Sequence, residues 1–331
     1  MKQAQFFRVF DKEKRIVDCT LCPRKCRIPD GALGRCHIRK NISGILYTTT
    51  YGRFTSVAFD PIEKKPLYHY YPSKEILSVG TAGCNFECPW CQNFEISQTS
   101  VDEVPTREIS PLELKSLAKR YNSFGIAYTY NEPLVNYEFV FDCAKEFYEA
   151  GLKNVLVTNF CINEEPFAKL LPYIDAANVD IKFFRNDPYK KICGGDLGAV
   201  MRNVEIFFKK GKHIELTFCV IPKENDDEND FKEFVDWIWS LSDRIPLHIS
   251  RYFPAYKFHR QPTPLKTLHR LRDIAIKKLK FVYLGNIFEE SNTYCPNCKA
   301  LLIKRKGYFV EITGLDGASC KYCGEILPII F

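Results

Sequence analysis

The chain has 331 residues, 46% of them hydrophobic, and 47 Lys and Arg residues against 40 Asp and Glu give a formal net charge of +7. This composition can supply a substantial core and argues against a largely disordered protein. Since the sequence contains neither an apolar run of about 18 residues nor a leader-like N-terminus, we expect a cytoplasmic protein with no membrane span, and the interspersed charges do not favour nucleic-acid binding.

Fifteen cysteines are unusual for a chain expected in a reducing compartment, where disulfides are not stable. The first four, which we call the N-terminal cysteines, are Cys19, Cys22, Cys26 and Cys36. Four thiolates at this spacing can enclose a zinc ion or a [4Fe-4S] cluster. The compact knuckle favours zinc. Basic neighbours favour an auxiliary cluster that relays electrons, because they would offset its charge: Arg24, Lys25, Arg27, Arg35 and His37. We prefer the cluster and leave zinc open.

A polar stretch punctuated by prolines follows at residues 60–69. The preferred interpretation is an extended connector whose charges face solvent. The alternative is that Lys64, Lys65 and His69 contact carboxylates of a ligand or substrate.

From residue 73 to residue 290, short β-rich runs alternate with helical patterns. Ser110 before Pro111 and Thr263 before Pro264 are typical N-caps, and Gly151 and Gly211 end two further helices. The predicted strands span residues 75–80, 125–130, 154–160, 178–184, 213–221, 246–253 and 280–287. Repeated βα units predict an α/β fold, a partial TIM-like (β/α)6 barrel, with a doubly wound open sheet as the competing architecture.

Directly after the first of these strands come Cys84, Cys88 and Cys91, which we call the loop cysteines. Three thiolates at spacings of four and three can hold a [4Fe-4S] cluster and leave one iron without a protein ligand. That iron can bind the amino and carboxylate groups of S-adenosylmethionine (SAM), so that an electron cleaves SAM to a 5'-deoxyadenosyl radical.

The remaining cysteines divide into two kinds. Four lie singly in apolar patterns and are predicted to be core residues: Cys143, Cys161, Cys193 and Cys219. The others, which we call the C-terminal cysteines, are Cys295, Cys298, Cys320 and Cys323. Their two CXXC knuckles predict a zinc ribbon over residues 291–331, behind an N-terminal segment (1–72) and the barrel (73–290). A solvated hairpin face is the preferred role of its basic strand, and nucleic-acid contact the alternative.

The CX3CX2C spacing, with an aromatic residue before the last cysteine, resembles the radical SAM superfamily. The resemblance implies that Trp90 lies near the adenine and that Asn131 and Glu132 lie in the segment that receives the SAM amino group, although Tyr130 and Asn131 replace two glycines of the usual motif. In the pyruvate formate-lyase activating enzyme branch, further SAM contacts correspond to Thr158, Asn159, Asp180 and Lys182. Alternation would place Asp180 and Lys182 on one inward face.

Two residues near the end of the sixth predicted strand, His248 and Arg251, are candidates for contact with SAM or substrate, and a structural role is equally plausible for the histidine. Asp180 with Lys182 as a buried ion pair, and Glu132 as a carboxylate at a helix start, are the corresponding structural alternatives.

The arrangement of motifs along the whole chain resembles the AmmeMemoRadiSam-system radical SAM proteins: CTLCPRKCRIPDGALGRC, YGRFTSVAFDPIEKKPLYHYYP, GTAGCNFECPWCQN, TYNEP, PLHISRYFP and the final CPNC and CKYCG. The resemblance implies Memo and AMMECR family proteins as partners, and we expect an electron donor such as ferredoxin or flavodoxin. Two other functions stay open, an activase of a glycyl-radical enzyme and a zinc-ribbon RNA-binding module or RNA modifier.

Overall fold

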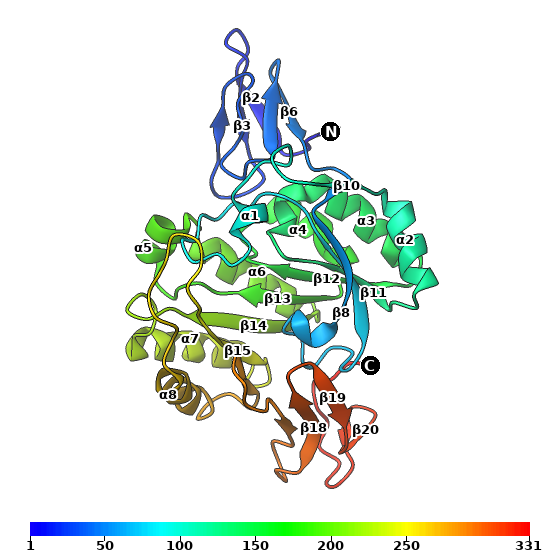
Figure 1. The fold of residues 1–331 in the computed structure, drawn as a ribbon, viewed down its shortest axis with the longest axis vertical. Coiled ribbons are helices and arrows are strands. Elements are labelled where there is room, and N and C mark those ends of the chain that lie inside the picture. Colours follow the sequence, from blue (N-terminus) through cyan, green and yellow to red (C-terminus); the bar gives the residue numbers. More distant parts are fainter.

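In the computed structural model, which describes residues 1–331, an eight-stranded sheet runs through the middle of the molecule (Figure 1). Its strands lie side by side in the order β16 (Val282–Gly285), β15 (Leu247–Arg251), β14 (His213–Val220), β13 (Ala176–Asp180), β12 (Lys153–Thr158), β11 (Gly125–Tyr128), β9 (Glu75–Gly80) and β8 (Ser56–Pro61). The seven strands from β9 to β16 are parallel, and β8 is antiparallel to β9. Because β8 and β16 are the two edges, the sheet is open.

Helices connect the parallel strands, as repeated βα units require. They are α1 (Phe94–Ser97), α2 (Pro111–Arg120), α3 (Tyr137–Glu149), α4 (Glu164–Leu170), α5 (Asn186–Pro188), α6 (Leu197–Lys209), α7 (Glu228–Leu241) and α8 (Leu265–Ala275). Short 3₁₀ turns lie at Ile62–Lys64, Pro133–Asn136 and Leu171–Tyr173, and a π-helical turn at Tyr189–Cys193. None of these helices has the length and apolarity that a membrane crossing requires.

Local signals predicted the helix ends with one exception. Ser110 caps α2 in a full capping box with Glu113, and Gly151 and Gly211 take left-handed backbone after α3 and α6. Thr263 is not an N-cap, which corrects that prediction. Its hydroxyl donates to the Val220 carbonyl, so it joins α8 to β14 instead.

The strands match the predicted runs to within a few residues. The largest difference is at β13, predicted over 178–184 and observed over Ala176–Asp180. The alternation of apolar residues continues past Asp180, but the ladder with β14 ends at the pair Asp180–Thr217. The main sheet also begins earlier than residue 73, because β8 belongs to it.

Smaller antiparallel sheets lie at opposite ends of the long axis (Figure 1). The N-terminal segment, blue in the figure, contains β1 (Lys2–Gln3), β2 (Phe7–Asp11), β3 (Ile16–Cys19), β4 (Arg27–Ile28), β5 (Arg39–Ile42) and β6 (Ile45–Thr48). β7 (Arg53–Phe54) pairs with β10 (Arg107–Glu108). The C-terminal module, orange to red, contains β17 (Thr293–Tyr294), β18 (Leu301–Lys306), β19 (Phe309–Ile312), β20 (Leu315–Asp316) and β21 (Ser319–Cys320).

The main hydrophobic core joins the parallel sheet, its helices and part of the N-terminal segment. The C-terminal module has a separate small core, in which Leu302, Ile303 and Leu327 pack with Phe281 and Tyr283 from β16 and its approach. The C-terminal module is therefore attached to the β16 edge of the main sheet through this small core.

Candidate active site

The loop that follows β9 is held in place by its own backbone and by Asn131. We call residues 81–93 the cluster loop. The Asn131 side chain donates to Thr81 Oγ1 and to the carbonyls of Ala82 and Gly83, and it accepts from the Thr81 backbone N–H. Gly83 has a φ of +87°, and a Cβ there would lie 2.4 Å from the Cys36 carbonyl oxygen. The chain therefore needs glycine at this point for both its backbone angle and its close contact.

The loop cysteines line one cavity of about 420 Å³. Cys84 Sγ accepts from the Phe86 backbone N–H at 3.3 Å, and Cys91 Sγ lies 3.1 Å from Ser97 Oγ. Cys88 is buried, and its thiol lies next to that of Cys193. This volume is in the usual range of small-molecule sites. Three thiols, which are side chains of a type that can bind metal, thus face a space that has room for a small ligand.

A buried carboxylate forms one wall of this cavity. Glu132 Oε1 accepts from Thr158 Oγ1 at 2.7 Å and from the Leu134 backbone N–H at 3.0 Å, and Oε2 accepts from the Asn159 backbone N–H at 2.8 Å. Burial raises the pKa of Glu132 to about 7, against the lowering effect of these hydrogen bonds. Each oxygen can accept two hydrogen bonds, so one acceptor position on Oε2 remains for a ligand.

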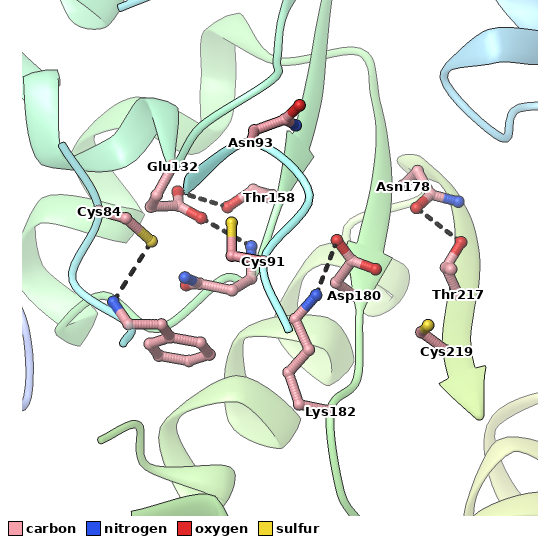
Figure 2. A network of polar contacts seen from close by, with 12 residues as sticks. Cys84, Cys91, Asn93, Glu132, Thr158, Asn178, Asp180, Lys182, Thr217 and Cys219 are labelled. Atoms are coloured by element: carbon pink, nitrogen blue, oxygen red, sulfur yellow. Dashed lines mark hydrogen bonds and ion pairs between the residues drawn. The ribbon is translucent and has the colours of Figure 1, made fainter. Parts of the chain in front are cut away.

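Asp180 and Lys182 lie on the same face, at the end of β13, and both line the cavity. Lys182 Nζ lies 3.2 Å from Asp180 Oδ2, and Figure 2 shows the pair facing the side of the cavity that carries Cys91 and Glu132. Burial alone would lower the pKa of Lys182, but Asp180 together with the neighbouring Cys88 and Cys219 outweighs burial and raises the pKa. The lysine is therefore a permanent positive charge in the cavity.

Tyr130 keeps the backbone conformation that a glycine would have in the usual motif. Its φ is +73°, a left-handed value that is strained for a bulky residue. The Tyr130 hydroxyl donates to Asp60, whose carboxylate also binds Lys64 Nζ at 2.8 Å and Lys65 Nζ at 2.6 Å. The aromatic ring thus fastens the connector to the cavity wall.

The connector is not a simple solvated linker. Lys64 and Lys65 line the cavity, and Lys65 is buried. Burial lowers the pKa of Lys65 to about 8 in spite of its bond to Asp60. His69 lies away from the cavity, with Nε2 2.6 Å from the Tyr283 hydroxyl.

The structure brings together most of the residues predicted to contact SAM. Those that line the cavity are Trp90, Asn131, Glu132, Thr158, Asn159, Asp180 and Lys182. His248 does not, which corrects its placement at a ligand. It is the second residue of β15, and its Nε2 lies 2.6 Å from Glu215 Oε2 in a closed polar cluster. Arg251 also faces elsewhere and donates to the Thr263 carbonyl.

Sequence reasoning missed several residues of the cavity. Cys219, predicted to be core, lines it from β14, and Cys193 contacts Cys88, whereas Cys143 is a core residue in α3. Asn178 and Thr217 also line the cavity and are hydrogen-bonded at 2.9 Å (Figure 2). The period-two alternation that leads from Asn178 to Asp180, and from Thr217 to Cys219, would have found them.

The C-terminal cysteines lie together outside the cavity. Cys295 and Cys323 have their sulfurs 3.6 Å apart, and Cys298 and Cys320 3.7 Å apart. All four sulfurs lie within 4.8 Å of one another, so they can bind a single metal ion. On the adjoining strand, Arg305 is fully buried, so the basic run of β18 does not present all its charge to solvent.

The chain is similar to known proteins in sequence and in fold. The model of the radical SAM superfamily matches residues 78–238. An uncharacterized protein of Methanocaldococcus jannaschii is 44% identical over 337 residues, which cover 100% of both chains. The 4-hydroxyphenylacetate decarboxylase activating enzyme of Clostridium scatologenes is 24% identical over 44% of this chain and 50% of its own length. SuiB of Streptococcus suis, solved bound to S-adenosylmethionine, has a similar fold, with a TM-score of 0.50 and 14% identity over 64% of this chain and 52% of SuiB.

Proposed function

This chain belongs to the radical SAM superfamily and is an enzyme, and we propose that it binds a [4Fe-4S] cluster through the loop cysteines and cleaves SAM reductively to a 5'-deoxyadenosyl radical. The observation that carries the proposal is that the three loop thiols line the same cavity as Glu132 and Asp180. A cluster bound there supplies the electron for cleavage.

The residues around the cavity have distinct roles in this proposal. Glu132 accepts a hydrogen bond from the SAM amino group through its remaining position on Oε2. Lys182 offers a positive charge to the SAM carboxylate, and Asp180 holds Lys182 in place at 3.2 Å. Trp90 is buried between Phe183 and Phe258, where its ring forms an apolar wall beside the adenine. These walls keep water away from the radical.

The overall arrangement supports two finer parts of the proposal. We infer that the open parallel sheet curves as a partial barrel around the cavity, because side chains from four of its strands, β12 to β15, reach the same space. We also infer that the C-terminal cysteines bind structural zinc. Zinc–sulfur bonds of about 2.3 Å set thiolates about 3.8 Å apart in a tetrahedron, and the sulfur–sulfur separations of 3.6 and 3.7 Å in the structure are close to this value.

Within the superfamily, we propose that the chain acts in an AmmeMemoRadiSam system. Its partners there are Memo and AMMECR family proteins, and a ferredoxin- or flavodoxin-like protein donates the electrons. The motifs along the full chain support this assignment. The second candidate is a glycyl-radical activase, and the similarity to a decarboxylase activating enzyme over half of that enzyme's length favours it. A partner whose glycine loses hydrogen to the radical would distinguish the activase.

The test is anaerobic reconstitution with iron and sulfide, followed by reduction with dithionite in the presence of SAM. We expect 5'-deoxyadenosine to form, and we expect Cys88→Ala to abolish it because two thiolates do not hold the cluster. The matched control is Cys143→Ala, which removes a buried thiol outside the cavity and should leave the product unchanged. Cleavage of SAM by Cys88→Ala would contradict the proposed site.

A further inference from the structure

The N-terminal cysteines lie on two tight turns of the N-terminal segment. Cys19 ends β3 and its backbone N–H donates to the Cys26 carbonyl at 2.9 Å, while the Lys25 N–H donates to the Cys22 carbonyl at 3.2 Å. Lys25 and His37, the neighbours of Cys26 and Cys36, both have left-handed backbone, with φ of +46° and +66°. Such turns bring cysteines that are separated in sequence toward one another.

Backbone N–H groups are directed at these sulfurs. The backbone N–H groups of Leu21, Arg24 and Ile38 lie close to the sulfurs of Cys19, Cys22 and Cys36, respectively. Cys84 of the cluster loop accepts in the same way from the residue two positions later, Phe86. A thiolate that binds a metal or cluster is stabilised by such donors.

The N-terminal cysteines also lie directly against the cluster loop. The Cys36 carbonyl oxygen packs against Gly83 so closely that a Cβ on Gly83 would lie only 2.4 Å from it. Gly83 directly precedes Cys84 of the cluster loop. Arg24 spans the junction, since its Nε donates to the Asn85 carbonyl at 2.9 Å and its Nη2 lies 3.1 Å from Glu87 Oε1. The contact is rigid, because Arg39 of the same segment forms a fully buried ion pair with Glu138 of α3 at 2.8 Å.

The spacing of the thiols separates this site from the C-terminal one. All four C-terminal sulfurs lie within 4.8 Å of one another, but no three of the N-terminal sulfurs do, and neither do the three loop sulfurs. A cubane cluster holds its thiolates on different irons and therefore farther apart than a single zinc ion does. Neither the N-terminal cysteines nor the loop cysteines form the compact group that the C-terminal cysteines form.

We propose that the N-terminal cysteines hold a second iron–sulfur cluster that passes electrons to the cluster of the loop cysteines. The relay rests on the proposed function, but the second cluster itself does not. In each transfer, the reduced N-terminal cluster loses one electron and the loop cluster gains it, and a one-electron donor of the ferredoxin or flavodoxin class restores the first. Cys22, Cys26 and Cys36 are only partly buried, so an external donor can approach this site.

The decisive variant is the full chain with Cys84, Cys88 and Cys91 all changed to Ala, reconstituted anaerobically with iron and sulfide. We expect it to retain about four irons per chain and a reduced-cluster signal in electron paramagnetic resonance. Absence of iron, with about two zinc ions per chain instead, would overturn the proposal. Because this variant cannot cleave SAM by the proposed route, the result does not depend on that activity.

The reciprocal variant is Cys22→Ala with Cys26→Ala. Iron should fall from about eight to about four per chain, and Cys143→Ala should keep the wild-type amount. SAM cleavage driven by reduced flavodoxin should fall at least tenfold relative to cleavage driven by dithionite. Unchanged iron would overturn the second cluster, and an unchanged ratio of the two rates would overturn the relay. Failure of the wild type to form 5'-deoxyadenosine would instead contradict the proposed function.

Discussion

The two ends of the parallel sheet both contain buried charged groups, but they use them in opposite ways. At the N-terminal ends of the strands, Glu215 accepts four hydrogen bonds, from the backbone N–H groups of Tyr68 and His69 and from the rings of His213 and His248. At the C-terminal ends, Glu132, Asp180 and Lys182 line a cavity of about 420 Å³. Groups at the first end are satisfied by one another, and groups at the second end have room for a ligand.

The pKa values of the buried carboxylates differ between the two ends in the same way. Burial alone would raise the pKa of Glu215, but hydrogen bonds from His213 and His248 lower it well below its usual value. Burial raises the pKa of Glu132 to about 7 because fewer partners compensate. The comparison teaches that burial of a charge does not identify a functional site, whereas burial with an acceptor position left open does.

Each end of the molecule contains a segment with four cysteines. We expect the largest change in stability when the C-terminal cysteines lose their metal ion. Cys295→Ser or Cys323→Ser should release about one zinc ion per chain and unfold the C-terminal module locally, because metal binding supplies about 10–16 kcal/mol to such small folds. Zinc content and proteolysis of the tail measure this. If both variants keep their zinc, the C-terminal site is not a zinc site.

The next largest effect concerns Arg305, which joins that module to the sheet. Its guanidinium donates to Thr293 Oγ1 at 2.6 Å and to the Tyr68 carbonyl at 2.7 Å, and it lies 4.5 Å from the centre of the Tyr68 ring. Arg305→Ala should lower the free energy of unfolding by about 3–5 kcal/mol, since it leaves buried partners unsatisfied.

Denaturant titration of Arg305→Ala is compared with Lys306→Ala, an exposed neighbour on the same strand that should change stability by less than about 0.5 kcal/mol. The iron content of the two variants should be the same. A loss of iron in Arg305→Ala alone would mean that the two ends are coupled and that the comparison is too simple.

At the other end, Glu132 should make SAM binding depend on pH. With a pKa of about 7, raised by burial, Glu132 is mostly protonated at pH 6 and mostly ionised at pH 8. A protonated carboxyl is a poor acceptor for the SAM amino group, so affinity should increase about tenfold over this interval. Glu132→Gln should bind more weakly and lose the pH dependence.

Binding of SAM to the reconstituted protein, measured by calorimetry under anaerobic conditions, checks this prediction. The control is Glu108→Gln, which changes an exposed carboxylate and should keep the wild-type pH profile. A profile that persists in Glu132→Gln would assign the titration to another group.

Local patterns in the sequence predicted most of the strands and several residues of the cavity. The strands follow from apolar runs, and alternation along the predicted strand placed Asp180 and Lys182, which the family resemblance had singled out, on one face. The positions of Glu215 and Arg305 do not, because their partners come from segments as distant as Tyr68 and Tyr283. Spacing of cysteines indicated three metal sites, yet it did not place Cys36 against Gly83, which depends on how the N-terminal segment packs.

His248 shows why the position of a residue in a strand matters. We predicted a ligand contact for it because its run, PLHISRYFP, leads to the end of the sixth strand, where ligands bind in α/β proteins. The observed β15 begins at Leu247, so His248 lies at its start, in contact with Glu215 and edge-on to the Tyr68 ring. The predicted strand, 246–253, began one residue before the observed one, so its own bounds already placed His248 near the start, away from the strand end where ligands bind.

His248→Gln gives the smallest expected effect and tests this placement directly. Glutamine can still donate to Glu215 but does not fill the space of the ring, so we expect the free energy of unfolding to fall by about 1 kcal/mol. SAM affinity should stay within about twofold of the wild type, because His248 does not line the cavity. The control is His269→Gln, which alters a histidine paired with Glu289 on the surface of α8 and should change neither quantity. A tenfold loss of SAM affinity in His248→Gln, with stability unchanged, would return this histidine to the ligand site and break the contrast between the two ends of the sheet.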